Sequence, residues 1–172
     1  MSYQPPFQLT HTMMRHVAYI GELIGLWKAA NQNKLVPELR RGNRIKTIQA
    51  SLAVEQNTLT LEQVTAVIEG KVVLGLPKEI QEVRNAFAAY EVMELWHPHH
   101  IEDLLAAHAL IDDAGHWRSK GAGIYRGEQL VHMAPPVSHI ARLVADLFDW
   151  LSHTDAHPLI ASAAFHYEFE FI

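Results

Sequence analysis

Cysteine is absent from the 172-residue sequence, which excludes disulfide bonds and thiolate nucleophiles. Long apolar runs are absent too, since no segment has the unbroken length that a membrane span requires. The first residues, Met1 to Pro6, lack the basic start and the apolar run of a signal peptide. These absences predict a soluble, cytoplasmic protein without a membrane partner.

Basic residues are few: 14 Lys and Arg stand against 19 Asp and Glu, which gives a formal net charge of −5. Binding to nucleic-acid phosphates usually needs a clustered excess of positive charge. The one basic cluster consists of Arg40, Arg41, Arg44 and Lys46, and its spacing is typical of a solvated helix face. We therefore expect no nucleic-acid partner for this segment.

Common catalytic motifs are also missing, namely a Gly-rich phosphate loop, a Gly-x-Ser-x-Gly elbow and a His-Glu-x-x-His pair. Twelve histidines raise the hypothesis of a zinc site. Its candidate ligands are His97, His99, His100 and His108, with Glu102 or Asp103. Because Pro98 splits this group, solvated or capping histidines are the favoured interpretation, and no metal site is predicted.

Helical periodicity covers most of the chain. Met13, Val17, Ile20, Ile24 and Trp27 recur at alternating spacings of four and three, which marks one face of a helix. Further helices are predicted to begin at or near Pro37, Thr60, Pro77, Pro98, Val137 and Pro158. Thr60 and Gln63 have the spacing of a capping box, so a helix should begin there.

The pattern changes between Gly121 and Pro136, where short extended runs flank Gly127 and predict a β-hairpin. A chain of this length fits one domain, which would bury about 70% of the surface of its unfolded chain. The predicted fold is one all-α domain with about seven helices and one small hairpin.

Two segments of the sequence resemble helices of a known protein family. Residues 51 to 60, Ser-Leu-Ala-Val-Glu-Gln-Asn-Thr-Leu-Thr, resemble the inhibitory helix of Fic (Fido) proteins, whose pattern is Ser or Thr, three residues, Glu, then Gly or Asn. Ser51 and Glu55 fit this pattern and Gln56 departs from it, while Asn57 and the residues after it fit the longer form. The segment from Phe165 to Ile172 resembles the helix that leads into the Fic active site.

This resemblance implies a Fic-like helical domain and the transfer of AMP from ATP to a hydroxyl group of a target protein. Residues 1–60 would form an N-terminal helical region with the inhibitory helix. Residues 61–172 would form the N-terminal part of the Fic core, including the hairpin, as one compact unit. The family's signature, roughly His-Pro-Phe-x-Asp-Gly-Asn-Gly-Arg, would follow Ile172. We therefore expect no catalytic residue here and no activity of the chain alone, while the complete family member would use ATP and Mg²⁺.

The resemblance also implies roles for three residues near the inhibitory pattern. In related proteins the Glu that corresponds to Glu55 pairs with an Arg of the signature and blocks placement of the ATP γ-phosphate. A carboxylate suits this role because it competes with phosphate for the same guanidinium donors. Ser51 lies on the same side of the helix as Glu55, and Asn57 would turn the chain after it.

The hairpin corresponds in position to the Fic flap, which holds a target segment through backbone pairing, although a plain structural hairpin remains an alternative. The candidate docking residues are Gly121, Gly123, Ile124, Tyr125, Val131 and His132. Arg118, Ser119 and Lys120 would help with phosphates if the flap lay over ATP.

The last helix has a structural interpretation beside the functional one, in which Leu159, Ala163, His166 and Phe169 face inward together. A non-enzymatic protein-interaction module derived from a Fic fold is the alternative function. The target protein is unknown in either interpretation, and a homo-oligomer is possible.

Overall fold

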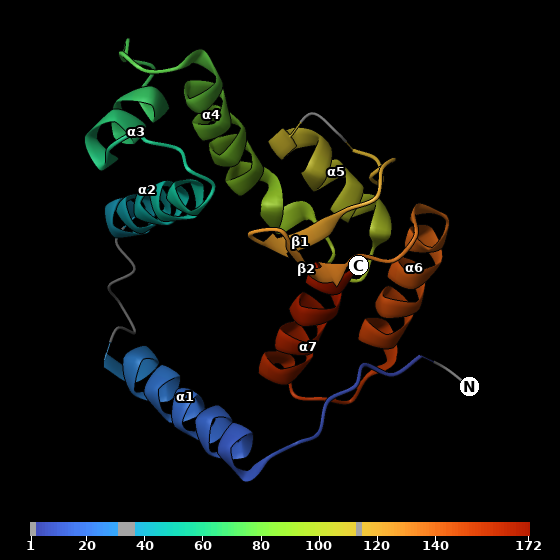
Figure 1. The fold of residues 1–172 in the computed structure, drawn as a ribbon. Coiled ribbons are helices and arrows are strands. Elements are labelled where there is room, and N and C mark those ends of the chain that lie inside the picture. Colours follow the sequence, from blue (N-terminus) through green and yellow to red (C-terminus); the bar gives the residue numbers. More distant parts are fainter. Residues whose placement is uncertain (1–2, 31–36, 113–114) are drawn as a thin grey trace. The chain divides into compact units, whose positions relative to one another are not determined.

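The computed structural model describes residues 3–30, 37–112 and 115–172, which fall into two compact units. The first unit comprises residues 1–28, 99–101 and 117–172, and the second comprises residues 29–98 and 102–116. In chain order the elements are α1 (His11–Ala30), α2 (Pro37–Val54), α3 (Leu61–Ile68), α4 (Pro77–Val92), the 3₁₀-helix η1 (Met93–Leu95), α5 (Ile101–Asp112), β1 (Gly123–Arg126), β2 (Gln129–Met133), α6 (Val137–His153) and α7 (Pro158–Phe171) (Figure 1). The predicted all-α fold with a small hairpin is confirmed.

Three helices form the core of the second unit. Ile48 of α2, Val64 of α3 and Val83 of α4 are all at most 1% exposed and belong to one apolar cluster. The predicted capping box is present at the start of α3, where Gln63 N–H donates to Thr60 Oγ1 at 3.3 Å and Thr60 N–H donates to Gln63 Oε1 at 2.9 Å. Because these bonds satisfy main-chain donors that α3 itself leaves free, they fix where α3 begins.

The first unit is centred on α6 and α7, which lie side by side in Figure 1. The amphipathic face of α6 buries Ile140, Val144 and Leu147. Phe148 of α6 meets Phe165 of α7 edge to face, with ring centroids 5.3 Å apart. Apolar burial at this helix pair therefore stabilises the first unit.

The inward face of α7 differs from the sequence prediction. Ile160, Ala161 and Glu168 are buried, whereas Leu159, Ala163 and His166 are exposed. Phe169 is half-buried and packs on the apolar cluster, as expected. The predicted face was wrong because α7 is apolar on several sides, so its sequence does not fix which side meets α6.

Helix α1 forms as predicted but buries none of its residues among those that the structure describes. Ile20, Ile24 and Trp27, which its period places on one face, are 38%, 46% and 51% exposed. The periodic pattern therefore identified the helix without identifying a partner for its apolar face. None of the described helices is both long and apolar enough to cross a membrane.

The N-terminal arm packs against the pair of α6 and α7. Phe7 meets Trp150 edge to face with ring centroids 6.2 Å apart, and the Tyr3 hydroxyl donates a hydrogen bond to Glu168 Oε2. Burial raises the pKa of Tyr3 well above its ordinary value, and the hydrogen bond and the charges of Glu168 and Asp146 raise it further. The hydrogen bond also gives the buried carboxylate of Glu168 a donor.

We predict that Tyr3→Phe lowers the free energy of unfolding by about 1–2 kcal/mol, because Glu168 loses its donor while it stays buried. Because the pKa of Tyr3 is higher in the folded state than in the unfolded chain, Tyr3 contributes its full stabilisation below about pH 10. This contribution is lost as the pH rises further. Urea unfolding at pH 7 and at increasing alkaline pH measures both effects, and the Tyr3-dependent loss at high pH should be absent in the variant. Tyr19→Phe, which alters an exposed hydroxyl on α1, is the control. Equal unfolding midpoints for the two variants would contradict the prediction.

Candidate functional site

The C-terminal end of α2 exposes two of the residues that the sequence assigned to the inhibitory pattern. Ser51 lies in the last turn of α2, and Glu55 follows directly after the last helical residue, Val54. Both side chains are exposed, and Val54 is 79% exposed. The end of α2 therefore presents a hydroxyl, a carboxylate and an apolar side chain on the surface of the second unit.

Gln56, which departs from the pattern, has a backbone φ of 68°. This is the left-handed conformation that commonly ends a helix, and it crowds the Cβ of every residue except glycine. Glycine and asparagine adopt it at the lowest cost, which gives a physical reason why the pattern has Gly or Asn at this position. In this chain Gln56 keeps the helix-ending geometry at a cost in strain.

Asn57 is buried and anchors the end of α2 to α4. Its Nδ2 donates to the main-chain oxygen of Glu79 at 3.1 Å and to Glu82 Oε2 at 2.9 Å, while its Oδ1 accepts from Leu59 N–H at 3.1 Å. Beside it, the N–H and hydroxyl of Thr58 donate to Glu79 Oε1 at 2.7 and 2.8 Å, and these bonds lower the pKa of Glu79. Asn57 thus holds the chain in place directly after the exposed Glu55.

The electrostatic position of Glu55 is unfavourable for folding. The last carbonyl groups of a helix carry a partial negative charge, so a carboxylate next to them is destabilising by a few tenths of a kcal/mol to about 1 kcal/mol. Within the part of the chain that the structure describes, no cation or hydrogen-bond donor pairs with the Glu55 side chain. The contacts of the fold therefore give no reason for a glutamate here.

The hairpin in the first unit pairs antiparallel strands β1 and β2. Ile124 lies opposite His132 and Tyr125 lies opposite Leu130, so Val131 is the extra residue of a bulge. Gly127 takes a φ of 61° in the turn that joins the strands. Because the described sheet has two strands, each strand keeps one edge whose main-chain groups lack a strand partner.

The predicted docking residues lie on this hairpin or next to it. Ile124 and Tyr125 are each 60% exposed and Val131 is 55% exposed, whereas His132 is half-buried. Gly121 has open space where a side chain would begin. At Gly123 an added Cβ would lie 3.1 Å from Leu130 Cδ1 and 3.3 Å from the His132 oxygen, so only glycine fits without a local shift.

Arg118 makes contacts that the sequence did not predict. Its Nη1 donates to the Lys120 oxygen at 2.9 Å, and its Nη2 donates to the oxygens of Pro135 and Ile172 at 2.5 and 3.1 Å. These bonds use three of the five N–H donors of the guanidinium group, and the expectation that Arg118 helps with phosphates stays a prediction. The half-buried guanidinium joins both ends of the hairpin segment to the end of α7.

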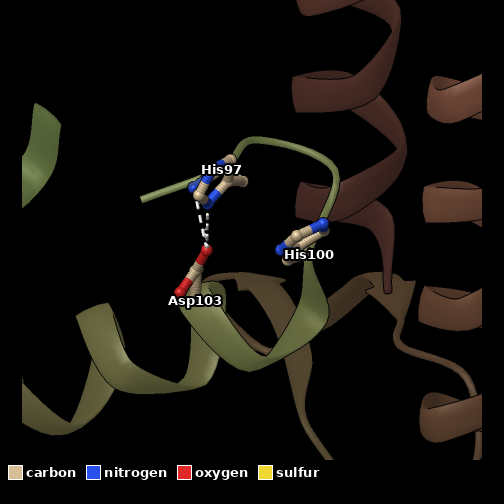
Figure 2. A group of neighbouring side chains, drawn as sticks. All are labelled: His97, His100 and Asp103. Atoms are coloured by element: carbon tan, nitrogen blue, oxygen red, sulfur yellow. Dashed lines mark hydrogen bonds and ion pairs between the residues drawn. The ribbon is translucent and has the colours of Figure 1, made fainter. Parts of the chain in front are cut away.

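Two of the histidines considered as metal ligands, His97 and His100, lie beside Asp103 within seven consecutive residues (Figure 2). One ligand atom of each lies within 4.8 Å of the other two, and imidazole nitrogen with carboxylate oxygen suits zinc. His97 N–H donates to Asp103 Oδ2 at 2.8 Å, and His97 Nδ1 lies 3.4 Å from the same oxygen. These contacts are sufficient to hold His97 and Asp103 together without an ion.

A surface pocket of about 550 Å³ lies in the first unit, between the N-terminal arm, α1 and the connection from α6 to α7. Apolar side chains such as Phe7 and Trp150 line much of it, and Asp155 adds a carboxylate. Its described lining contains neither Lys nor Arg. The described lining therefore lacks the Lys and Arg side chains that commonly bind the phosphates of a nucleoside triphosphate.

Comparison with known proteins finds one family model and a solved structure that match this chain. The model of the Fic/DOC family matches residues 98–172, which include α5, the hairpin, α6 and α7. Among solved structures, a Fic family protein from Desulfovibrio desulfuricans G20 is 62% identical in sequence and superposes with a TM-score of 0.90. The match covers 99% of this chain and 54% of that chain, so this chain spans about half the length of that protein. The comparison with curated proteins gives no match.

We predict that Gln56→Gly raises the free energy of unfolding of the second unit by about 0.5–1 kcal/mol, because glycine takes the left-handed conformation without strain. Gln56→Asn should give a smaller gain in the same direction. Gln56→Ala keeps a Cβ and should leave stability nearly unchanged, which makes it the matched control. Thermal and urea unfolding measure the stability of each variant. If Gln56→Ala raised the free energy of unfolding as much as Gln56→Gly, the left-handed conformation at this position would not be the cause of the gain.

Asn57→Ala should lower the free energy of unfolding by about 2 kcal/mol, because Leu59 N–H loses its buried acceptor and the bonds that tie Asn57 to Glu79 and Glu82 of α4 are lost. The control is Asn43→Ala, which alters an exposed asparagine of α2 and should be neutral or slightly stabilising. Urea unfolding of both variants checks the difference. Similar small effects for the two would show that Asn57 does not anchor α2.

Proposed function

Because this chain belongs to the Fic/DOC family, we propose that it takes part in the transfer of AMP from ATP to a hydroxyl group of a target protein. In this proposal the end of α2 is the inhibitory element and the hairpin docks the target. The family's catalytic signature, which no stretch of these 172 residues matches, supplies the ATP- and Mg²⁺-dependent centre. The chain by itself does not transfer AMP.

The observation that carries the inhibitory role is the exposed Glu55 carboxylate, which has no partner in the described part of its unit. A guanidinium group is its natural partner, since the planar fork of arginine binds a carboxylate through two parallel hydrogen bonds. The same donors would otherwise bind the γ-phosphate of ATP. Pairing with Glu55 therefore excludes the productive position of the nucleotide.

The anchoring of Asn57 supports this role. An inhibitory carboxylate needs a fixed position, because a mobile side chain loses more conformational entropy when it pairs. Three hydrogen bonds of Asn57 fix the main chain two residues after Glu55. The second unit thus presents Glu55 from a rigid support while its side chain stays accessible.

The exposed edges of the hairpin support target docking. An extended target segment would add a strand through main-chain hydrogen bonds, which place its backbone without reading most of its side chains. Ile124, Tyr125 and Val131 would contact the segment's apolar groups. Such docking orients a hydroxyl group, and adenylyl transfer depends mainly on orientation and charge neutralisation.

A chimera tests the proposal: this chain replaces the matching 54% of the Desulfovibrio desulfuricans protein, whose remaining half is expected to carry the signature. With labelled ATP and Mg²⁺, the chimera should label a protein target and the isolated chain should not. Glu55→Gln in the chimera should raise labelling at least about tenfold, because the amide loses the charge that competes with phosphate.

Glu94→Gln is the matched control, since Glu94 is an exposed glutamate of η1 in the same unit. It should leave labelling unchanged. Equal labelling by wild type and Glu55→Gln would contradict the inhibitory role, and labelling by the isolated chain would contradict its proposed inactivity.

The exposed apolar side chains of the hairpin also favour a second function, a non-enzymatic module that binds a partner protein. Under this alternative the chimera transfers no AMP, yet the isolated chain still binds extended peptides through the hairpin. Chemical-shift changes at β1 and β2 on addition of such peptides, with no labelling activity, would favour the alternative over AMP transfer.

A further inference from the structure

The guanidinium group of Arg118 connects three segments of the first unit that lie far apart in the sequence. Its acceptors are the main-chain oxygens of Lys120 before β1 and of Pro135 after β2, and an oxygen of Ile172, the last of the 172 residues, directly after α7. The contact with Ile172 spans 54 residues of sequence. One side chain thus contacts both ends of the hairpin segment and the C-terminal end of α7.

Arginine suits this position for two physical reasons. The last carbonyl oxygens of a helix have no acceptor role within the helix and carry partial negative charge, so a cation stabilises them. Its rigid planar fork also donates in several directions at once, whereas a lysine ammonium is a compact point charge on a flexible stem. The arrangement of three acceptors around one side chain therefore suits arginine better than lysine.

His132 provides a second link between the same elements. Its ring lies 4.7 Å from the ring of Phe171, and its Nε2 lies 3.4 Å from the Phe171 oxygen. His132 belongs to β2, so the hairpin itself contacts the last turn of α7. Figure 1 shows the hairpin beside this end of α7.

Apolar burial contributes little to the placement of the hairpin. Every residue of β1 is exposed, and within β2 only His132 is half-buried. A two-stranded hairpin is marginally stable by itself in water. The contacts of Arg118 and His132 with the end of α7 therefore link the hairpin to the rest of the unit where apolar burial contributes little.

We propose that Arg118 is a positioning residue that holds the hairpin and the C-terminal end of α7 in one fixed arrangement, with His132 as a secondary contact. The two elements then move together. The consequence for catalysis rests on the proposed function: Arg118 would align a docked target segment with the chemistry expected at the end of α7. The coupling of the hairpin to α7 does not depend on that function.

Hydrogen exchange of this 172-residue chain tests the coupling. In Arg118→Gln, amides of β1, β2 and the last turn of α7 should exchange at least about tenfold faster, because several hydrogen bonds are lost at once. Amides at the centre of α6 should exchange at the wild-type rate. Arg118→Lys should restore only part of the protection.

Arg126→Gln is the matched control, since it removes the same charge from an exposed arginine at the end of β1. It should leave exchange at the last turn of α7 unchanged. If Arg118→Gln exchanges like wild type, or if its α6 amides accelerate as much as its hairpin amides, the proposal is wrong. If Arg118→Gln does not fold, Arg118→Lys is compared with wild type instead. Faster exchange of the hairpin amides but not of the α6 amides supports the proposal, and unchanged exchange of the hairpin amides contradicts it.

A kinetic measurement in the chimera separates the coupling from the proposed function. Arg118→Gln should raise the KM for the protein target and leave the KM for ATP unchanged, and Arg118→Lys should recover part of the loss. A chimera without AMP transfer would contradict the proposed function. The hydrogen-exchange result would still test the coupling of the hairpin to α7, because that experiment does not depend on AMP transfer. Equal increases in both KM values would contradict a positioning role.

Discussion

Main-chain hydrogen-bonding groups at the ends of helices are the constraint on which the candidate functional surfaces depend. A helix leaves its last carbonyl groups without internal partners, and buried groups of this kind must find donors elsewhere. At the end of α2 the main-chain N–H groups of Gln56 and Asn57 donate to the oxygens of Ala53 and Leu52, and at the end of α7 Arg118 and His132 supply the donors. The side chain of Asn57 then ties this end of α2 to α4. Each unit therefore fixes a helix end and the residues beside it.

In both units a functional candidate lies next to such an anchor and is itself exposed. Glu55 is two residues from buried Asn57, and the exposed strand β1 begins five residues after half-buried Arg118. This division is physically useful, because the anchor contributes stability while its neighbour keeps its polar groups for another molecule. The unfavourable charge of Glu55 at a helix end and the strained φ of Gln56 are small costs in stability beside such anchors.

Local patterns predicted the elements well and the packing poorly. The capping box of Thr60 and Gln63 and the turn at Gly127 were predictable because each depends on residues a few positions apart. The face of α7 was not predictable, since apolar residues occur on several of its sides and only α6 and the N-terminal arm select one. The contacts of Arg118 were also missed, because its acceptors are main-chain oxygens and these give no sequence signal.

The sequence by itself determined the helical fold, the hairpin and the resemblance that led to the family, because periodicity, turn residues and motifs are local properties of the chain. The tertiary structure decided which members of those motifs are exposed and which are anchored. Ser51, Glu55 and Asn57 belong to one sequence pattern, yet Asn57 alone is buried among partners from α4. Burial and long-range hydrogen bonds depend on segments that meet only when the chain folds, so no local pattern could separate the anchoring residue from the accessible ones.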